Sequence, residues 1–441
     1  MSLISQSCPS CGAPLPATGE VQICTHCGNE WRVADSPVST TPAAAKPALD
    51  KRPEARPGSR VRRWTIIAGV CVALVIGFVW LRVFGSDRFS HYRAINAAAL
   101  SPDGRLLASV HGQGLETNCT LRIWDAASGA QLHRFDGVDT PMWIVHWSPD
   151  GRWLATGGQT GAIQLWNTAD WQPAQRLEGA AGYARNLAWS PDSKLIATGD
   201  EHGVLRIWEA ASGRVLVNEP IHTKDIEALA WSPDSRLIAT GSWDNSAQII
   251  DPSTGKSLFR FSDKSYVSCV AWSPDGKRLA TGGLSNTVRL WDATSGAELR
   301  TFEGHGNSIT ALAWSPDGKQ IASTGNDQTV RLWDVAIGKA LFILDNRGYD
   351  ANLMWSPDGS QLASGADGLV RLWDAANGQM QELRGHERQS RILIIAWSAD
   401  SKQLVTLGAY DDTLRVWDVA AQRATSVIKI SFAEAFRHAL F

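Results

Sequence analysis

A repeat of about 40 residues constrains the fold of this chain more than any other feature. The tripeptide Ser-Pro-Asp occurs seven times, and an eighth copy reads Ser-Ala-Asp. Seven of the eight copies follow a Trp, and a Trp-Asp pair or a close variant lies near the end of each unit. These two repeated positions account for 14 of the 21 Trp residues, which indicates eight copies of one structural unit. The copies begin at Ser101, Ser148, Ser190, Ser232, Ser273, Ser315, Ser356 and Ser398.

Each unit has the pattern of four short antiparallel strands. Residues 308–314 alternate in the manner of a buried strand, and Ser315-Pro-Asp-Gly is a tight turn. A single sheet of this size cannot bury both faces, whereas sheets stacked around an axis can. We therefore predict an all-β, eight-bladed propeller over residues 85–430. Its last strand comes from residues 424–430, without exchange between the termini, so the seam between blades one and eight is expected to be weakest.

The repeats resemble WD40 repeats over about residues 91–430, because Gly-His precedes some units and Trp-Asp ends the third strand. The resemblance implies a buried hydrogen-bond network of His, Ser or Thr, Asp and Trp within a blade, with a structural and not a catalytic role. Blade four has Ile250 in the Trp position, and blade seven has Asn346 in the His position while keeping Asp367. The complete sets are His305, Ser323, Asp327 and Trp333 in blade six, and His386, Thr406, Asp411 and Trp417 in blade eight.

Two Cys-x-x-Cys-Gly motifs near the start predict a structural zinc site. Each motif places two thiolates on one tight turn, and two such turns supply the four sulfur ligands that tetrahedral Zn²⁺ prefers. Residues 1–34 are too few to fold around a hydrophobic core, so metal binding would supply most of their stability. The alternative is two local redox pairs or disulfides. The predicted ligands of this zinc ribbon are Cys8, Cys11, Cys24 and Cys27.

A basic linker and a charge-free segment predict one membrane span. Residues 35–63 are rich in Pro, Ala and basic residues, which is typical of a disordered linker. Residues 64–81 carry no charge, and a helix over residues 64–84, in which Arg82 snorkels, would extend about 31 Å, enough to cross a bilayer core. Lys and Arg are more frequent before the span than after it, so the positive-inside rule predicts a cytoplasmic N-terminus and an extracytoplasmic propeller. The span and the linker would contact membrane lipid. Residues 431–441 are expected to form a short helix that covers the seam.

Loops at one end of the predicted propeller carry aromatic and Arg side chains at equivalent repeat positions. The WD40 resemblance places these positions on one rim, the top face, where their composition is typical of a protein-binding hot spot. The alternative is that the Tyr rings pack flat over the blade edges. The residues of this predicted binding surface are Tyr183, Tyr266, Tyr349, Trp243, Tyr410, Trp143, Arg388 and Arg391.

These features together favour a membrane-anchored interaction scaffold that binds a protein or peptide through its top face. The chain contains no Gly-x-Ser-x-Gly, phosphate-loop or His-Glu-x-x-His motif, so we predict no enzymatic activity. The formal net charge of -2 excludes a chain that is basic throughout, and no nucleic-acid partner is expected. Two alternatives remain: a propeller that binds or processes a small molecule or glycan, and a ribbon that recruits nucleic-acid machinery.

Overall fold

The chain divides into two compact units, residues 1–75 and 76–441. In the first unit, β1 (Val21–Ile23) pairs antiparallel with β2 (Glu30–Arg32). The predicted zinc ligands, linker, membrane span and C-terminal helix lie outside the described residues. Among the described residues, the structure has no helix that is long and apolar enough to cross a membrane. The computed structural model describes residues 21–23, 30–32, 95–111, 119–138, 142–178, 184–348, 352–388 and 390–429.

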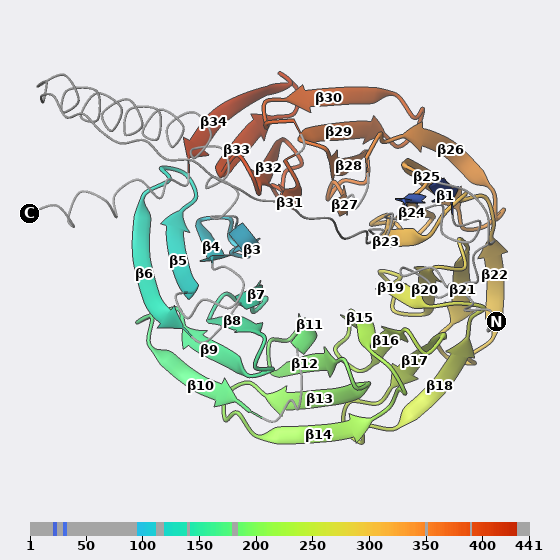
Figure 1. Ribbon diagram of the computed structural model, residues 1–441, viewed down its shortest axis with the longest axis horizontal. Coiled ribbons are helices and arrows are strands. Elements are labelled where there is room, and N and C mark those ends of the chain that lie inside the picture. Colours follow the sequence, from blue (N-terminus) through green and yellow to red (C-terminus); the bar gives the residue numbers. More distant parts are fainter. Residues whose placement is uncertain are drawn as a thin grey trace, which may run out of the picture. The chain divides into compact units, whose positions relative to one another are not determined.

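The second unit contains eight four-stranded antiparallel sheets arranged around a central axis (Figure 1). In every sheet the spatial order of the strands follows their order in the chain. The first strand of each sheet therefore lies nearest the axis, and the fourth lies at the periphery. The predicted all-β, eight-bladed propeller is confirmed.

The first four blades follow one another without strand exchange, and each strand pairs antiparallel with the next strand of its own blade. Blade one contains β3 (Ile95–Leu100), β4 (Leu106–His111), β5 (Cys119–Asp125) and β6 (Gln131–Val138). Blade two contains β7 (Met142–Trp147), β8 (Trp153–Gly158), β9 (Ile163–Asn167) and β10 (Pro173–Leu177). Blade three contains β11 (Ala184–Trp189), β12 (Leu195–Asp200), β13 (Val204–Glu209) and β14 (Val215–Pro220). Blade four contains β15 (Ile226–Trp231), β16 (Ile238–Ser242), β17 (Ser246–Ile250) and β18 (Ser257–Ser262).

The last four blades repeat this arrangement. Blade five contains β19 (Val267–Trp272), β20 (Arg278–Gly283), β21 (Val288–Asp292) and β22 (Glu298–Phe302). Blade six contains β23 (Ile309–Trp314), β24 (Gln320–Gly325), β25 (Thr329–Asp334) and β26 (Ala340–Asp345). Blade seven contains β27 (Asn352–Trp355), β28 (Gln361–Ala366), β29 (Leu369–Asp374) and β30 (Met380–Arg384). Blade eight contains β31 (Ile392–Trp397), β32 (Gln403–Gly408), β33 (Thr413–Asp418) and β34 (Arg423–Lys429).

The second strand of each blade is buried on both faces because sheets pack against it from either side. In β12, five of the six residues are buried, and the strand is built from small and β-branched side chains. A Cβ added to Gly199 would lie 2.5 Å from a methyl carbon of Ile226 in blade four. The small residues of this strand therefore let neighbouring blades approach closely.

The Trp before each Ser-Pro-Asp turn joins its blade to the preceding one. Trp147 Nε1 donates to the carbonyl oxygen of Ala99 at 2.9 Å, and Trp314 Nε1 donates to Ala271 at 3.0 Å. The same bond recurs at every repeat that carries this Trp, and it satisfies the indole N–H of a largely buried ring. The remaining donors are Trp189, Trp231, Trp272, Trp355 and Trp397.

The seam between blades one and eight differs because Leu100 occupies the Trp position. Among the described residues β3 lies beside β31, and Ile95, Leu107 and Trp124 of blade one share a buried cluster with Leu407 and Leu414 of blade eight. Apolar packing therefore closes the ring. The side chain of leucine has no N–H donor, so the indole bond that joins the other blades cannot form here. This gives a physical reason for the expected weakness of the seam.

Replacing Leu100 by Trp is expected to raise the free energy of unfolding by about 1 kcal/mol. By analogy with Trp147 and Ala99, the new indole would donate across the seam to the carbonyl oxygen of Ala396. Urea denaturation would measure the gain. The reverse change, Trp314→Leu, serves as the control and should lower stability. A Leu100→Trp variant that is no more stable than the parent would contradict this explanation of the seam.

Candidate binding surface and polar networks

The structure brings together all four residues of the polar network in blade six. His305 Nε2 lies 2.7 Å from Ser323 Oγ, and His305 Nδ1 lies 2.9 Å from Asp327 Oδ2. Trp333 Nε1 donates to Ser323 Oγ at 2.8 Å. The chain of bonds runs from the indole through the hydroxyl and the imidazole to the carboxylate. It ties the third strand of the blade to the loop that enters the blade.

Blade eight holds its four residues in the same way. His386 contacts Thr406 at 2.8 Å and Asp411 at 2.8 Å, while Trp417 Nε1 donates to Thr406 Oγ1 at 2.8 Å. The imidazole of His386 is fully buried, and Asp411 also accepts the backbone N–H of Glu387. The two additional residues between His386 and its first strand therefore do not disrupt the network.

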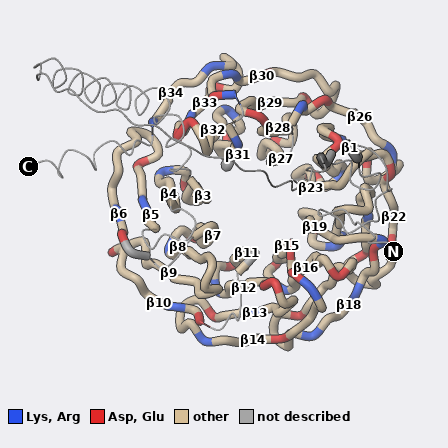
Figure 2. The backbone as a smooth tube through the Cα atoms, in the orientation of Figure 1, with Lys and Arg blue, Asp and Glu red and all other residues tan. Residues whose placement is uncertain are grey.

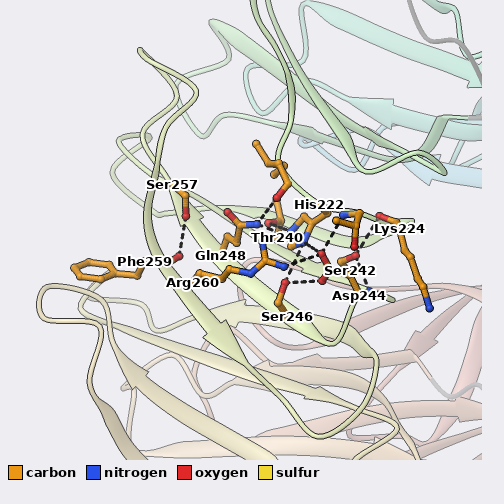
Figure 3. A network of polar contacts seen from close by, with 12 residues as sticks. His222, Lys224, Thr240, Ser242, Asp244, Ser246, Gln248, Ser257, Phe259 and Arg260 are labelled. Atoms are coloured by element: carbon orange, nitrogen blue, oxygen red, sulfur yellow. Dashed lines mark hydrogen bonds and ion pairs between the residues drawn. The ribbon is translucent and has the colours of Figure 1, made fainter.

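In blade four the network forms without a Trp (Figure 3). His222 Nε2 lies 2.8 Å from Thr240 Oγ1, and His222 Nδ1 lies 3.0 Å from Asp244 Oδ2. Ser246 and Gln248 of β17 also approach the imidazole. Ile250 packs in the position that Trp333 has in blade six, as the common strand register shows.

Burial lowers the pKa of the imidazoles in blades four and six, His222 and His305, below the ordinary value for His. Burial lowers the pKa of His305, and this effect outweighs the opposing influence of Asp327. Burial would by itself raise the pKa of Asp327, but hydrogen bonds from the Gly306 N–H, Thr329 and His305 lower the pKa overall. At neutral pH, Nδ1–H of His305 therefore donates to an ionised Asp327, and Nε2 accepts from Ser323.

Blade three replaces this network with a buried ion pair that the sequence interpretation missed. Arg206 Nη1 lies 2.6 Å from Asp200 Oδ2, and the two side chains are 6% and 2% exposed. Asp200 also accepts the backbone N–H groups of His202 and Val204. A signal for the pair was present, because Asp200 ends a Thr-Gly-Asp segment at a position where six of the other seven blades carry Gly, Ala or Ser.

Blades five and seven also depart from the common network. In blade five, Asp263 lies at the position equivalent to His305, and its carboxylate is 3.9 Å from Arg289 Nε. In blade seven, Ser364 Oγ donates to Asn346 Oδ1 at 2.9 Å and accepts from Trp373 Nε1 at 2.9 Å. Asp367 is exposed on the adjoining turn and has a positive φ of 51°. Each departure supplies a different polar partner at the same place in the blade.

Backbone hydrogen bonds place the two aromatic repeat positions at the same end of the propeller. Trp243 N–H donates to Asp225 O, and Leu284 N–H donates to Tyr266 O. Ala409 N–H donates to Arg391 O in blade eight. The turn between strands two and three therefore lies beside the loop that enters the blade. This end of the ring carries the residues of the predicted binding surface that fall within the described part of the chain.

Lys224, Trp243 and Tyr266 form a cluster across blades four and five, which we call the rim cluster. The rings of Trp243 and Tyr266 are stacked, with centroids 5.7 Å apart and planes at 14°. Lys224 Nζ lies 5.5 Å from the centroid of the Tyr266 ring. Trp243 remains 36% exposed. Tyr266 is half-buried, so it packs against its neighbour and still contributes to the surface.

The other predicted surface residues do not join this cluster. Tyr410 is 62% exposed in blade eight, and Arg388 and Arg391 of the same blade are also exposed. Trp143 is 37% exposed at the start of β7, and its Nε1 donates to Ala184 O in blade three at 3.2 Å. Tyr183 and Tyr349 lie outside the described residues.

Charged residues of both signs are distributed around the blades (Figure 2). Many form local pairs within a turn, such as Lys319 with Asp317 at 3.4 Å. Such exposed pairs contribute little to stability. Among the described residues, no group of three or more His, Cys, Asp or Glu side chains could hold a metal ion.

Two family models match the propeller. The model described as IFT122 first beta-propeller matches residues 266–434. The model described as WD domain, G-beta repeat matches residues 86–125, 129–167, 171–209 and 214–251. Between them they cover parts of all eight blades.

Similarity to curated proteins is confined to short segments. The chain is 36% identical over 69 residues to WD repeat-containing protein 90 of Mus musculus, which is 15% of this chain and 4% of that protein. It is 33% identical over 76 residues to Autophagy-related protein 18 of Meyerozyma guilliermondii, which is 17% of this chain and 13% of that protein. The chain therefore spans only a small part of either relative.

Solved structures resemble the whole propeller. The computationally designed Ika8 protein matches with a TM-score of 0.64 and 24% identity, over 75% of this chain and 97% of that chain. Sqt1 of Chaetomium thermophilum matches with a TM-score of 0.67 and 19% identity, over 75% of this chain and 96% of that chain. At this identity the likeness concerns the fold. The strand topology makes the second unit an eight-bladed β-propeller, and its first four blades match the model of the WD domain, G-beta repeat.

Proposed function

We propose that this chain is a membrane-anchored interaction scaffold whose propeller binds a protein or peptide through its top face. The observation that carries the proposal is the rim cluster, in which stacked Trp243 and Tyr266 rings and a Lys ammonium group share one rim. Exposed aromatic side chains held in place by packing are typical anchors of protein interfaces. WD40 propellers are in general non-enzymatic scaffolds, which agrees with the lack of a catalytic motif in the sequence.

A surface variant tests the proposal. Replacing Trp243, Tyr266 and Tyr410 together by Ser should lower partner capture at least about tenfold, because hot-spot anchors each contribute about 2 kcal/mol or more. Capture would be measured by quantitative cross-linking and affinity purification from native membranes. The melting temperature should change little, since Trp243 and Tyr410 are substantially exposed.

A matched control separates this surface from general apolar exposure. Leu132, Val215 and Leu258 are 46–49% exposed on the outermost strands β6, β14 and β18. Their joint replacement by Ser should leave partner capture unchanged. Equal loss of capture in the control variant, or full capture by the top-face variant, would refute the proposed binding surface.

We further propose that Cys8, Cys11, Cys24 and Cys27 hold a structural Zn²⁺. Four thiolates are a donor set that tetrahedral zinc prefers. The pairing of β1 with β2 supports the proposal, because Ile23 lies opposite Glu30 and residues 24–29 connect them. The second Cys-x-x-Cys motif falls between these two paired strands in the sequence. Purified protein should contain about one zinc per chain, and Cys24→Ser with Cys27→Ser should abolish it, whereas Cys269→Ala should not.

The anchor and its orientation complete the proposal. Residues 64–84 would cross the bilayer, and the basic linker before them would contact anionic lipid on the cytoplasmic side. The propeller would then lie on the opposite side of the membrane. Protease added to sealed cells or vesicles, from each side in turn, would distinguish this orientation from its reverse. Release of the full chain from membranes by high salt alone would contradict a spanning anchor.

A further inference from the structure

Blade two contains a cavity of about 570 Å³ at the position where blade four holds His222. It lies between β6 of blade one and strands β8, β9 and β10 of blade two. The side chains that contact His222 in blade four are Thr240, Asp244, Ser246 and Gln248. Their equivalents in blade two all line the cavity, and they are Thr156, Thr160, Ala162 and Gln164.

The strand register establishes this equivalence. Thr240 pairs with Gln248 across β16 and β17, and Thr156 pairs with Gln164 across β8 and β9. The His position itself falls at Val138, 18 residues before Thr156, as His222 lies 18 residues before Thr240. The backbone of Val138 pairs with Cys119 as the last residue of the eight-residue strand β6. The longer strand therefore keeps this position within the sheet of blade one.

The hydroxyl that binds an imidazole in the other blades is retained. Thr156 is 1% exposed, and its Oγ1 accepts Trp166 Nε1–H at 3.0 Å, as Ser323 accepts Trp333 in blade six. In blade six the same oxygen also lies 2.7 Å from His305 Nε2. Thr156 therefore presents one O–H donor toward the cavity, matched to a ring nitrogen that accepts a hydrogen bond.

The other walls fit a flat ring with an acidic substituent. Phe135 and Trp166 line one side, with ring centroids 4.8 Å apart. Arg134 and Arg176 line the outer part beside Asp136. Arg134 Nε bonds to Asp136 and Arg176 Nε bonds to Glu178. The planar guanidinium group is suited to carboxylates and phosphates. The volume lies in the range of small-molecule sites and exceeds that of an imidazole alone.

We propose that this cavity binds a planar nitrogen heterocycle of imidazole type that bears an anionic group. The ring takes the place that a His side chain fills in blades four, six and eight, with its acceptor nitrogen on Thr156. The anionic group lies toward Arg134 and Arg176. This site is separate from the top-face binding surface and goes beyond the proposed scaffold function. Either a free heterocycle or a terminal His of a peptide carries this chemistry.

Calorimetric titration of the full chain with imidazole-4-acetate tests the proposal, with phenylacetate as the probe that lacks ring nitrogen. Imidazole-4-acetate should bind saturably at one site, and phenylacetate should bind about tenfold more weakly, because one buried hydrogen bond is lost. Thr156→Val should weaken imidazole-4-acetate binding by a similar factor. The peptide Gly-Gly-His distinguishes the two sources: tighter binding than imidazole-4-acetate assigns the site to a peptide terminus, and weaker binding assigns it to a free heterocycle.

A matched variant controls for loss of structure. Thr281 in blade five also accepts a Trp indole bond, from Trp291 at 2.9 Å, but it does not line the cavity. Thr281→Val removes the same kind of bond and should leave imidazole-4-acetate affinity within about twofold of the parent. Equal affinities for the two acetates, unchanged binding by Thr156→Val, or equal loss in both Val variants would overturn the assignment. The lack of saturable binding by the unmodified chain would overturn it as well.

Discussion

Replacing Asp200 by Ala is expected to lower the free energy of unfolding by about 3–5 kcal/mol. The change leaves the Arg206 guanidinium, 6% exposed in the native protein, without the carboxylate that lies 2.6 Å from it. It also removes the acceptor for the backbone N–H groups of His202 and Val204. A buried cation without its partner is far more costly than the pair is stabilising. Urea denaturation followed by Trp fluorescence would measure the loss.

Two further variants separate the cost of the unpaired charge from the value of the pair. The double variant Asp200→Val with Arg206→Met should recover most of the stability, because removing both charges leaves no buried ion. Asp345→Ala breaks an exposed ion pair, in which the Asp345 side chain is 67% exposed and the Arg347 side chain is 76% exposed. This variant should lower the free energy of unfolding by less than about 1 kcal/mol. If Asp200→Ala and Asp345→Ala proved equally mild, the buried pair would matter no more for stability than the exposed pair.

Replacing Trp333 by Ala is expected to lower the free energy of unfolding by about 4–5 kcal/mol. Trp333 is 2% exposed and belongs to a cluster shared by blades five and six. Its ring lies beside Phe302, with centroids 5.6 Å apart, and its Nε1 donates to Ser323. The variant would lose this packing and also one member of the polar network. Differential scanning calorimetry and urea denaturation would both record the change.

The position of the ring, and not the residue type, determines this effect. Trp243→Ala removes the same type of side chain, but Trp243 lies at the rim and is 36% exposed. This variant should lower the free energy of unfolding by less than about 1 kcal/mol. Trp333→Phe keeps most of the apolar area but loses the indole donor, so it should cost about 1–2 kcal/mol. A Trp333→Ala variant as stable as Trp243→Ala would show that blade six does not depend on this network.

The repeat alone predicted the blades and most of their strands. A period of 41 to 47 residues, with a Ser-Pro-Asp turn and two Trp positions, admits one four-stranded unit per copy. The turn explains why the prediction succeeds, because it is closed by local bonds: Ser315 Oγ donates to Asp317 at 2.7 Å and accepts the N–H of Gln320. Hydrogen bonds between residues a few positions apart depend only on the local sequence. They can therefore be predicted without knowledge of distant contacts.

The candidate surface was predictable only in part. Position in the repeat indicated that Trp243 and Tyr266 share a rim, but their stacking depends on the approach of blades four and five. The cavity in blade two has no sequence signature of its own. It follows from the extension of β6 to Val138 and from Ala162 in a place where blade four has Ser246. Only comparison of the folded blades reveals it.

The sequence by itself determined the number of blades, the order of their strands and the residue types of each turn, because these depend on local propensity repeated at a constant period. The tertiary structure decided how the blades satisfy their buried polar groups, with His305 in blade six and with Arg206 and Asp200 in blade three, whereas blade two has a cavity at this place. The physical reason is that a buried donor needs a partner but does not specify which one. Neighbouring strands supply that partner, and their approach is set by the closed ring.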